Sequence, residues 1–452
     1  MEFFKENLDL IRKNDYILYR KLLELDIDNG NYTIIETKNG RYTLKVRDYD
    51  GIRETVTFLH SKYNPNREAA NFAKIQFSEK SKINIIYGFG LGYHIEKILE
   101  ILDIDDILYV VDLNLEVFKI ALKLNDLRHI LSDKRLKFII SDDEKWVAKR
   151  FKNLLSDENK FVIYPPSIKT IPNKYSYFKF LMEDWNMKKS ITEKWSELLK
   201  DNFQKNKKIA CDNIGVLFNS YKNKPIIIVS AGPSLNKNKH LLKKIKGKAF
   251  IFSVGSALKP LLKIGVKPDM FCIIDPQPIT YKQIEGFEDL DIPLVFLNTA
   301  SAYTVSKYKG PKYVAVNRSS EHEKPEYLID MGGSVATAVM DMAIKFGGNP
   351  IVFIGQDLAF TNGEHHADGN MYGEDEKVKS LPNMRKIRGQ NGEILDTTLG
   401  LLSFKYWIEN KIKDNPHIEF INATEGGAYI EGCKHMKLQE FIDKYINFKK
   451  SF

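Results

Sequence analysis

The sequence predicts an α/β protein built on parallel, Rossmann-like sheets. Three short apolar runs follow one another, each ending in a small or acidic residue: 226–229, 249–254 and 270–274. Apolar runs of this length are typical of buried parallel strands, and the helical patterns between them complete the βαβ arrangement. A second unit of the same kind is predicted near residue 82, where another apolar run precedes a glycine turn.

Composition narrows the possible classes of protein. The chain has 452 residues, too many for one ordinary domain, and its 43% hydrophobic and 12% aromatic content excludes a disordered protein. The net charge of +9 is spread along the chain without an arginine-rich or aromatic basic stripe, so no nucleic-acid partner is expected. Three separated cysteines argue against a disulfide framework. Neither a membrane span nor a signal peptide is recognisable, which indicates a cytoplasmic location.

The N-terminal half is interpreted as two domains. Residues 1–75 are predicted to form one amphipathic helix, over 1 to about 23, and a small β element with a hairpin turn at Asn39-Gly40. Residues 76–190 are predicted to form a Rossmann-like domain. Its turn GFGLG and Asp112, about 20 residues later, approach a dinucleotide or S-adenosylmethionine fingerprint. The third glycine of that fingerprint is missing, so a scaffold is favoured over a cofactor site.

The C-terminal half is divided into a helical connector (191–223), a catalytic domain (224–432) and a helical tail (433–452). In the catalytic domain, SAGPS ends the first strand. Gly232 lacks a Cβ that would hold a ligand away, and Ser234 is predicted to cap the next helix and leave N–H groups free for a nucleotide phosphate. The same edge of the sheet is expected to carry the further site residues Ser230, Pro233, Gly255, Ser256 and Asp275.

A second group of candidates lies further along the chain. Gly333 and Ser334 precede a helical pattern, which predicts an N-cap and a second anion-binding helix start. The strand over 350–354 ends in Gly355, Gln356 and Asp357. The loop after it contains Glu364, His365, His366 and Asp368, a composition that suits a metal or a solvated loop, and the solvated loop is favoured. A long helix from Leu395 and a strand ending in the turn of Asn422 and Glu425 complete the predicted domain.

Three long motifs carry a resemblance to a known family. SAGPSL, GGSVATAVMDMAIKFGGNPIVFIGQDLAFT and NATEGGAYIEG resemble the motility-associated factor (Maf) glycosyltransferases, which are similar to bacterial sialyltransferases. The resemblance covers about 205–432, with weaker echoes in SKYNPNREA and GFGLGYH. It implies a sialyltransferase-like catalytic domain and a metal-independent, inverting transfer of pseudaminic or legionaminic acid from its CMP ester to Ser or Thr of flagellin. The reaction would take place in the cytoplasm without a cofactor and would serve flagellum assembly and motility.

The resemblance also assigns residues. It implies that 230–235 binds CMP, that Gly255 and Ser256 contact the nucleotide, that Ser334 lies near CMP, and that Gly355 with Asp357 matches a conserved pair at a strand end. Two departures stand out, because Ala359 replaces the family's tyrosine and no histidine occurs between His366 and His417. The catalytic base therefore has four candidates: Asp357, His365, His366 and Asp396. The structural alternatives are that Asp357 caps a turn and Asp396 caps the following helix.

Two other functions remain open on the sequence. Hydroxymethylpterin pyrophosphokinases look similar over the central block and would bind ATP at the same turn, with Mg²⁺ on Asp275 and Asp357. A flagellin-binding protein without activity is the third possibility. The N-terminal domains are assigned to acceptor recognition as a hypothesis, and the sequence leaves the oligomeric state open.

Overall fold

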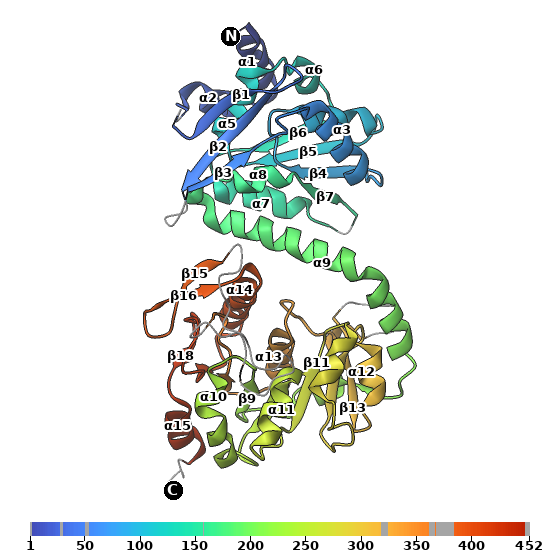
Figure 1. Ribbon diagram of the computed structural model, residues 1–452, viewed down its shortest axis with the longest axis vertical. Helices are drawn as coiled ribbons and strands as arrows, with labels where there is room; N and C mark the ends of the chain where they lie inside the picture. Colours follow the sequence, from blue (N-terminus) through green and yellow to red (C-terminus); the bar gives the residue numbers. More distant parts are fainter. Residues whose placement is uncertain are drawn as a thin grey trace. The chain divides into compact units, whose positions relative to one another are not determined.

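The computed structural model describes residues 2–27, 30–49, 54–156, 158–317, 324–360, 367 and 384–447. The chain divides into two compact units, Met1–Lys189 and Ser190–Phe452. Figure 1 shows each unit with its own sheet. Helix α9 (Ser176–Asn206) begins in the first unit and ends in the second. None of the described helices is long and apolar enough to cross a membrane.

The first unit begins with two helices, α1 (Glu2–Asn14) and α2 (Tyr16–Glu24), so the prediction of one helix is wrong. Asp15 separates them because its carboxylate accepts the Leu18 N–H at 2.9 Å and caps α2. The predicted small β element is present as an antiparallel sheet of β1 (Tyr32–Glu36), β2 (Tyr42–Tyr49) and β3 (Glu54–Phe58).

A parallel four-stranded sheet forms the centre of the first unit, which confirms the predicted Rossmann-like domain. Its order is β6-β5-β4-β7, with β4 (Ile83–Tyr87), β5 (Ile107–Asp112), β6 (Leu136–Ile140) and β7 (Lys160–Ile163). Two apolar clusters, one on each face, hold it between helices. These helices are α3 (Pro65–Gln76), α4 (Tyr93–Ile101), α5 (Leu115–Leu124), α6 (Arg128–Leu131), α7 (Glu144–Leu154) and α8 (Pro165–Lys169).

The second unit is built on a nine-stranded parallel sheet of order β18-β17-β14-β9-β10-β11-β12-β13-β8. The strands are β8 (Asp212–Asn213), β9 (Ile226–Val229), β10 (Phe250–Val254), β11 (Met270–Ile273), β12 (Leu294–Leu297), β13 (Lys312–Ala315), β14 (Ile351–Ile354), β17 (Phe420–Asn422) and β18 (Lys434–His435). The sheet thus takes in β8 and β18, from segments interpreted as connector and tail. The chain proceeds from β9 to one side and places β14 on the other, so the strand order reverses between β9 and β14.

Helices cover both faces of this sheet, over two apolar clusters. They are α10 (Leu235–Asn238), α11 (Gly255–Lys263), α12 (Ala302–Lys307), α13 (Val335–Lys345), α14 (Leu399–Asp414) and α15 (Leu438–Phe441). A hairpin of β15 (Arg385–Arg388) and β16 (Ile394–Thr397) precedes α14. The predicted long helix from Leu395 is therefore shorter, because 394–397 is strand and Thr398 caps α14 by accepting the Leu401 N–H at 3.3 Å.

Candidate functional site

The turn after β9 lies directly against the end of β14, where the strand order reverses. The Gly232 N–H donates to the Gly355 carbonyl at 2.8 Å, and the Ser230 hydroxyl donates to Oε1 of Gln356 at 2.6 Å. Gly355 has φ +64°, and a Cβ there would lie 2.2 Å from the Ser230 carbonyl oxygen. The SAGPS turn and the Gly355-Gln356-Asp357 turn are therefore one structural element, and Gly355 must be glycine.

Asp357 is the residue around which the two turns close. Its carboxylate accepts the Ser234 N–H at 3.2 Å and the Ser234 hydroxyl at 2.7 Å, and the residue is only 3% exposed. A Cβ on Gly232 would lie 2.1 Å from Oδ2 of Asp357. The missing side chain at Gly232 thus admits a carboxylate of the protein itself.

The predicted cap at Ser234 is wrong. Its hydroxyl bonds Asp357 instead of the helix, and α10 has only four residues. The neighbouring amides are also engaged, because Leu235 donates to the Gly232 carbonyl at 3.0 Å and Asn236 donates to the Pro233 carbonyl at 3.2 Å. The expectation of free N–H groups at this turn is therefore wrong as well.

The NATEGGA turn after β17 completes the same cluster. Thr424 Oγ1 accepts the Gln356 N–H at 3.2 Å, and the Ala428 N–H donates to the Asp357 carbonyl at 2.7 Å. A Cβ on Gly426 would lie 2.2 Å from the Ser234 hydroxyl, and one on Gly427 would lie 2.2 Å from the Asp357 carbonyl. All three motifs singled out in the sequence thus meet at the carboxyl ends of β9, β14 and β17.

Two predicted site residues of this last turn make internal contacts. Glu425, at φ +62°, accepts the Asn238 side-chain amide at 3.1 Å and the Leu438 N–H at 3.0 Å, and so ties the turn to α15. Asn422 is fully buried, and its Oδ1 accepts the Thr424 N–H at 3.1 Å. Within the described residues the Asn422 amide nitrogen has no hydrogen-bond partner.

Two predicted site residues that follow the neighbouring strands β10 and β11 are at least partly accessible. Ser256 is half-buried in the first turn of α11. Asp275, which follows β11, is exposed by its solvent-accessible surface. Surrounding protein nevertheless desolvates the Asp275 carboxyl and raises its pKa. Gly255, which starts α11, is buried against Gln283, whose Oε1 would lie 2.0 Å from an added Cβ.

The start of α13 has the predicted geometry. Ser334 accepts the Thr337 N–H at 3.3 Å and donates its own N–H to the Thr337 hydroxyl at 3.2 Å, which confirms the N-cap as a capping box. Gly333 has φ +99° and is exposed. Gly332 is glycine because an added Cβ would lie 2.5 Å from the Trp407 ring of α14.

Of the remaining candidates for the base, Asp396 lies within the described residues. Asp396 lies in β16, where it forms an ion pair with Lys386 at 2.7 Å, and the alternative that it caps α14 is wrong because Thr398 does so. His365 and His366, with Glu364 and Asp368, lie outside the described residues. Among the residues that are described, no group of three or more His, Cys, Asp and Glu could hold a metal ion.

Sequence reasoning missed two asparagines that support this edge. Asn202 in α9 donates to the Pro276 carbonyl at 2.9 Å and accepts the Ala302 N–H at 3.1 Å. Asn206 donates to the Ala300 carbonyl at 2.7 Å. The signal available in the sequence was their spacing, because two asparagines four positions apart share one face of a helix although asparagine is a poor helix former.

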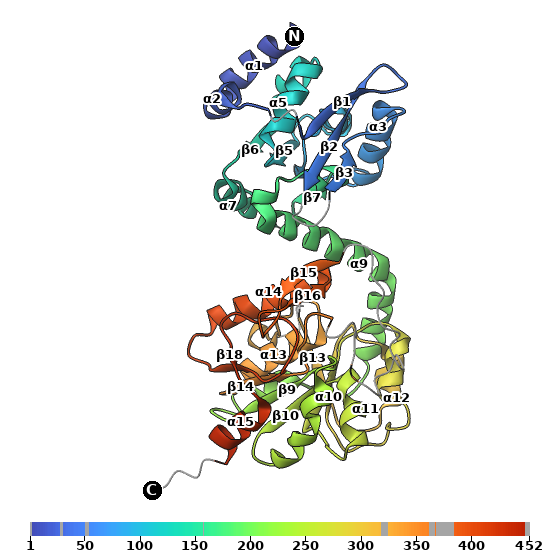
Figure 2. The ribbon, with the colours of Figure 1, turned by 60° about the vertical axis from the view of Figure 1, so that its left-hand side comes forward.

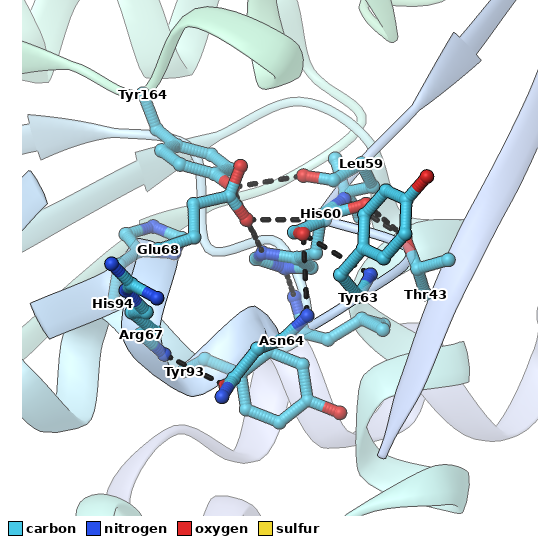
Figure 3. A network of polar contacts seen from close by, with 12 residues as sticks. Thr43, Leu59, His60, Tyr63, Asn64, Arg67, Glu68, Tyr93, His94 and Tyr164 are labelled. Carbon is cyan, nitrogen blue, oxygen red and sulfur yellow. Dashed lines mark hydrogen bonds and ion pairs between the residues drawn. The ribbon is translucent and has the colours of Figure 1, made fainter. Parts of the chain in front are cut away.

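The glycine turn of the first unit is filled by a buried aromatic network (Figure 3). The Leu91 N–H donates to Nε2 of His60 at 3.0 Å, so the proton of neutral His60 lies on Nδ1, 2.8 Å from the Tyr164 oxygen. His94 stacks on Tyr164 with ring centroids 4.0 Å apart, and its Nε2 lies 2.9 Å from the Gly88 carbonyl. Burial lowers the pKa of both histidines, that of His94 to about 3.

The glycines and the aspartate of the dinucleotide-like fingerprint also make contacts with other residues of the protein. A Cβ on Gly90 would lie 2.9 Å from Nε2 of His60, and one on Gly88 would lie 2.3 Å from the Ser167 hydroxyl. Asp112 accepts the N–H groups of Phe89 and Asn114, both at 2.9 Å, and burial raises its pKa to about 6. These contacts favour the scaffold interpretation of this turn.

Comparisons with known proteins find a similarity in each of the two units. The Glycosyltransferase Maf N-terminal domain matches residues 4–167, and the 6-hydroxymethylpterin diphosphokinase MptE-like family matches 198–363. A solved structure, that of a MAf glycosyltransferase from Magnetospirillum magneticum AMB-1, is 16% identical, with 97% of this chain and 75% of that chain covered and a TM-score of 0.49. No curated protein matches. Residues 4–167 are therefore similar to the N-terminal domain of the Maf glycosyltransferases and residues 198–363 to an MptE-like domain, and the first of these similarities supports a glycosyltransferase role.

Proposed function

We propose that the chain transfers a nonulosonic acid, pseudaminic or legionaminic acid, from its CMP ester to Ser or Thr hydroxyls of flagellin in the cytoplasm, without a cofactor. The observation that carries this proposal is the convergence of three motifs at one sheet edge, where the turns after β9, β14 and β17 interlock around Asp357. Ligands of open α/β sheets bind at the carboxyl edge where strand order reverses. The Maf N-terminal domain supports the same class of reaction.

Such a transfer leaves negative charge on the departing phosphate. The Ser234 N–H already donates to Asp357, so it is not free to stabilise this charge. The more accessible helix N-termini at Ser334 and Ser256 stabilise it instead. The rigid support of the site is then formed by Gly232, Pro233 and the Gly355 turn. Asp357 positions Ser234 instead of contacting the donor.

The acceptor hydroxyl must also lose a proton. Asp275 joins the candidates Asp357, His365, His366 and Asp396 for this role, because the residue is exposed and desolvation of its carboxyl raises its pKa. A carboxylate with a raised pKa takes a proton more readily than an ordinary one. Asp275→Asn is expected to lower transfer at least about 100-fold while donor binding changes little.

The test is a titration followed by a transfer assay. CMP is expected to bind in EDTA without Mg²⁺ in a calorimeter, and incubation with a CMP-nonulosonate is expected to raise the mass of purified flagellin. Binding of CMP that depends on Mg²⁺, or flagellin of unchanged mass with both sugars, would count against the proposal.

One observation favours a second candidate, which is transfer of diphosphate from ATP to 6-hydroxymethylpterin. The MptE-like match covers the central strands and their turns. This reaction would need Mg²⁺ on carboxylates such as Asp275 and Asp357, and the two Ser234 donors compete with a metal for Asp357. ATP binding that requires Mg²⁺, with no CMP binding, would select it. Failure of both nucleotides would select a flagellin-binding protein without activity.

A further inference from the structure

Strand β6 forms an open edge of the parallel sheet in the first unit (Figure 2). The Leu108 N–H donates to the Arg135 carbonyl, and the Ser141 N–H donates to the Asp112 carbonyl, so the odd-numbered positions of this stretch face β5. Backbone groups alternate along a strand, which directs the N–H and C=O of Phe138 away from the sheet. Within the described part of the chain, these two groups have no hydrogen-bond partner.

A groove of about 1280 Å³ runs along this edge. The end of α1 forms one wall, including Lys13 and Asn14, and α7 forms the other, including Trp146 and Arg150. Half-buried Phe138 lies between the walls. The groove therefore combines a free strand edge with apolar and aromatic surface.

The groove is strongly basic. Five exposed cations line it and form no ion pairs within the described residues: Lys13, Lys134, Lys137, Lys149 and Arg150. The two carboxylates that line it are already engaged, because Asp15 caps α2 and Asp133 pairs with Arg135 at 2.6 Å. A single lysine on an edge strand commonly prevents aggregation. Five unpaired cations around one groove instead provide a surface complementary to negative charge.

We propose that this groove binds an extended acidic segment of a partner protein, which adds as a fifth strand beside β6. Strand addition uses backbone hydrogen bonds for affinity and side-chain contacts for specificity, and here Phe138 supplies the bonds and the five cations select acidic side chains. A second copy of this chain is disfavoured, because pairing two β6 edges would bring the two sets of cations together. The proposal does not depend on the function proposed above.

The test uses the full chain and a fluorescein-labelled peptide of eight residues with alternating Glu and Val, followed by fluorescence anisotropy. Binding is expected, and it should weaken as salt rises. The double variant K137E/K149E is expected to bind at least about tenfold more weakly, since two attractive charges become repulsive. The matched control K74E/K200E reverses two exposed lysines that lie outside the groove and form no ion pair with any described residue, and it should bind like the parent chain.

Two further probes separate strand addition from charge attraction alone. The same peptide with an N-methyl group at every residue keeps its charge but has no free N–H and is sterically blocked along both edges, so it should bind at least about tenfold more weakly. Amide hydrogen exchange at Phe138 should slow when the parent peptide is bound. Equal affinity for the methylated peptide, tighter binding of a single-stranded RNA of the same charge, or an equal loss in the control variant would each overturn the proposal.

Discussion

One glycine turn follows β4 in the first parallel sheet and another follows β9 in the second, and the protein fills the two turns with different side chains. In the first unit, Gly90 lies against the neutral rings of His60 and His94. In the second, Gly232 lies against the carboxylate of Asp357, which Ser234 holds with two hydrogen bonds. Both turns look like ligand sites in sequence, although in both the room made by glycine is taken by the protein.

The surroundings of the two turns differ. The first turn is covered by Tyr164 and Asp112, which are themselves buried and hydrogen-bonded. The second is flanked by Ser256, Asp275 and Ser334, which remain partly accessible at the same edge. A glycine turn therefore indicates close backbone approach, and the accessible polar groups beside it are the candidates for contact with a ligand.

The largest expected effect is on the turn of the second unit. Gly355→Ala should lower the free energy of unfolding by about 4 kcal/mol, because the new Cβ meets the Ser230 carbonyl at 2.2 Å and φ is +64°. Gly265→Ala is the control, since φ is +76° but nothing lies within 4 Å of the added Cβ, and about 1 kcal/mol is expected. Urea unfolding measures both, and similar losses would show that close approach is not what requires glycine at 355.

Sequence patterns predicted the sheets because apolar β-branched runs such as Ile226 to Val229 are buried on both faces. The small β element and the N-cap at Ser334 also followed from local residues. Ser234 could not be predicted in the same way. Its preference for helix caps is local, but Asp357 lies more than 100 positions away in sequence and forms the stronger, charge-assisted hydrogen bond.

The same reasoning explains the error at Asp396. Asp and Thr are both good caps, and which of them caps α14 depends on where the preceding hairpin ends. That end is set by cross-strand pairing of β15 with β16, including the ion pair of Asp396 with Lys386. Local sequence preference does not contain that information.

The second prediction concerns the acid sensitivity of the first turn. Burial lowers the pKa of His94 to about 3, so the unfolded chain binds the proton first as pH falls below about 6.5. Above that pH, His94 does not lower the free energy of unfolding. Below it, the free energy of unfolding falls by about 1.4 kcal/mol per pH unit, down to about pH 3. His60 acts in the same direction.

Asp112 opposes this trend, which provides the control. Its pKa is raised to about 6, so protonation of the folded protein between pH 6 and 4 contributes stability. Asp112→Asn removes that contribution and should lose stability more steeply than the parent chain between pH 6.5 and 4.5. Urea unfolding of both proteins at several pH values measures the difference, and parallel curves would contradict the raised pKa of Asp112. If the stability of Asp112→Asn did not fall as the pH drops below about 6.5, the assignment of His94 as buried and neutral would be contradicted.

The smallest expected effects distinguish the two serines of the second unit. Ser234→Ala should cost about 2 kcal/mol, because the buried Asp357 carboxylate loses one of its donors. Ser334→Ala should cost about 1 kcal/mol, the usual effect of losing an N-cap. The effects on CMP affinity should have the opposite order, with Ser334→Ala weakening binding more than Ser234→Ala. The reason is that Ser334 lies at an accessible helix start and Ser234 is fully buried. Unfolding and CMP titration of the same two variants test this, and if Ser234→Ala alone weakened CMP binding, the donor would contact the buried turn and not the start of α13.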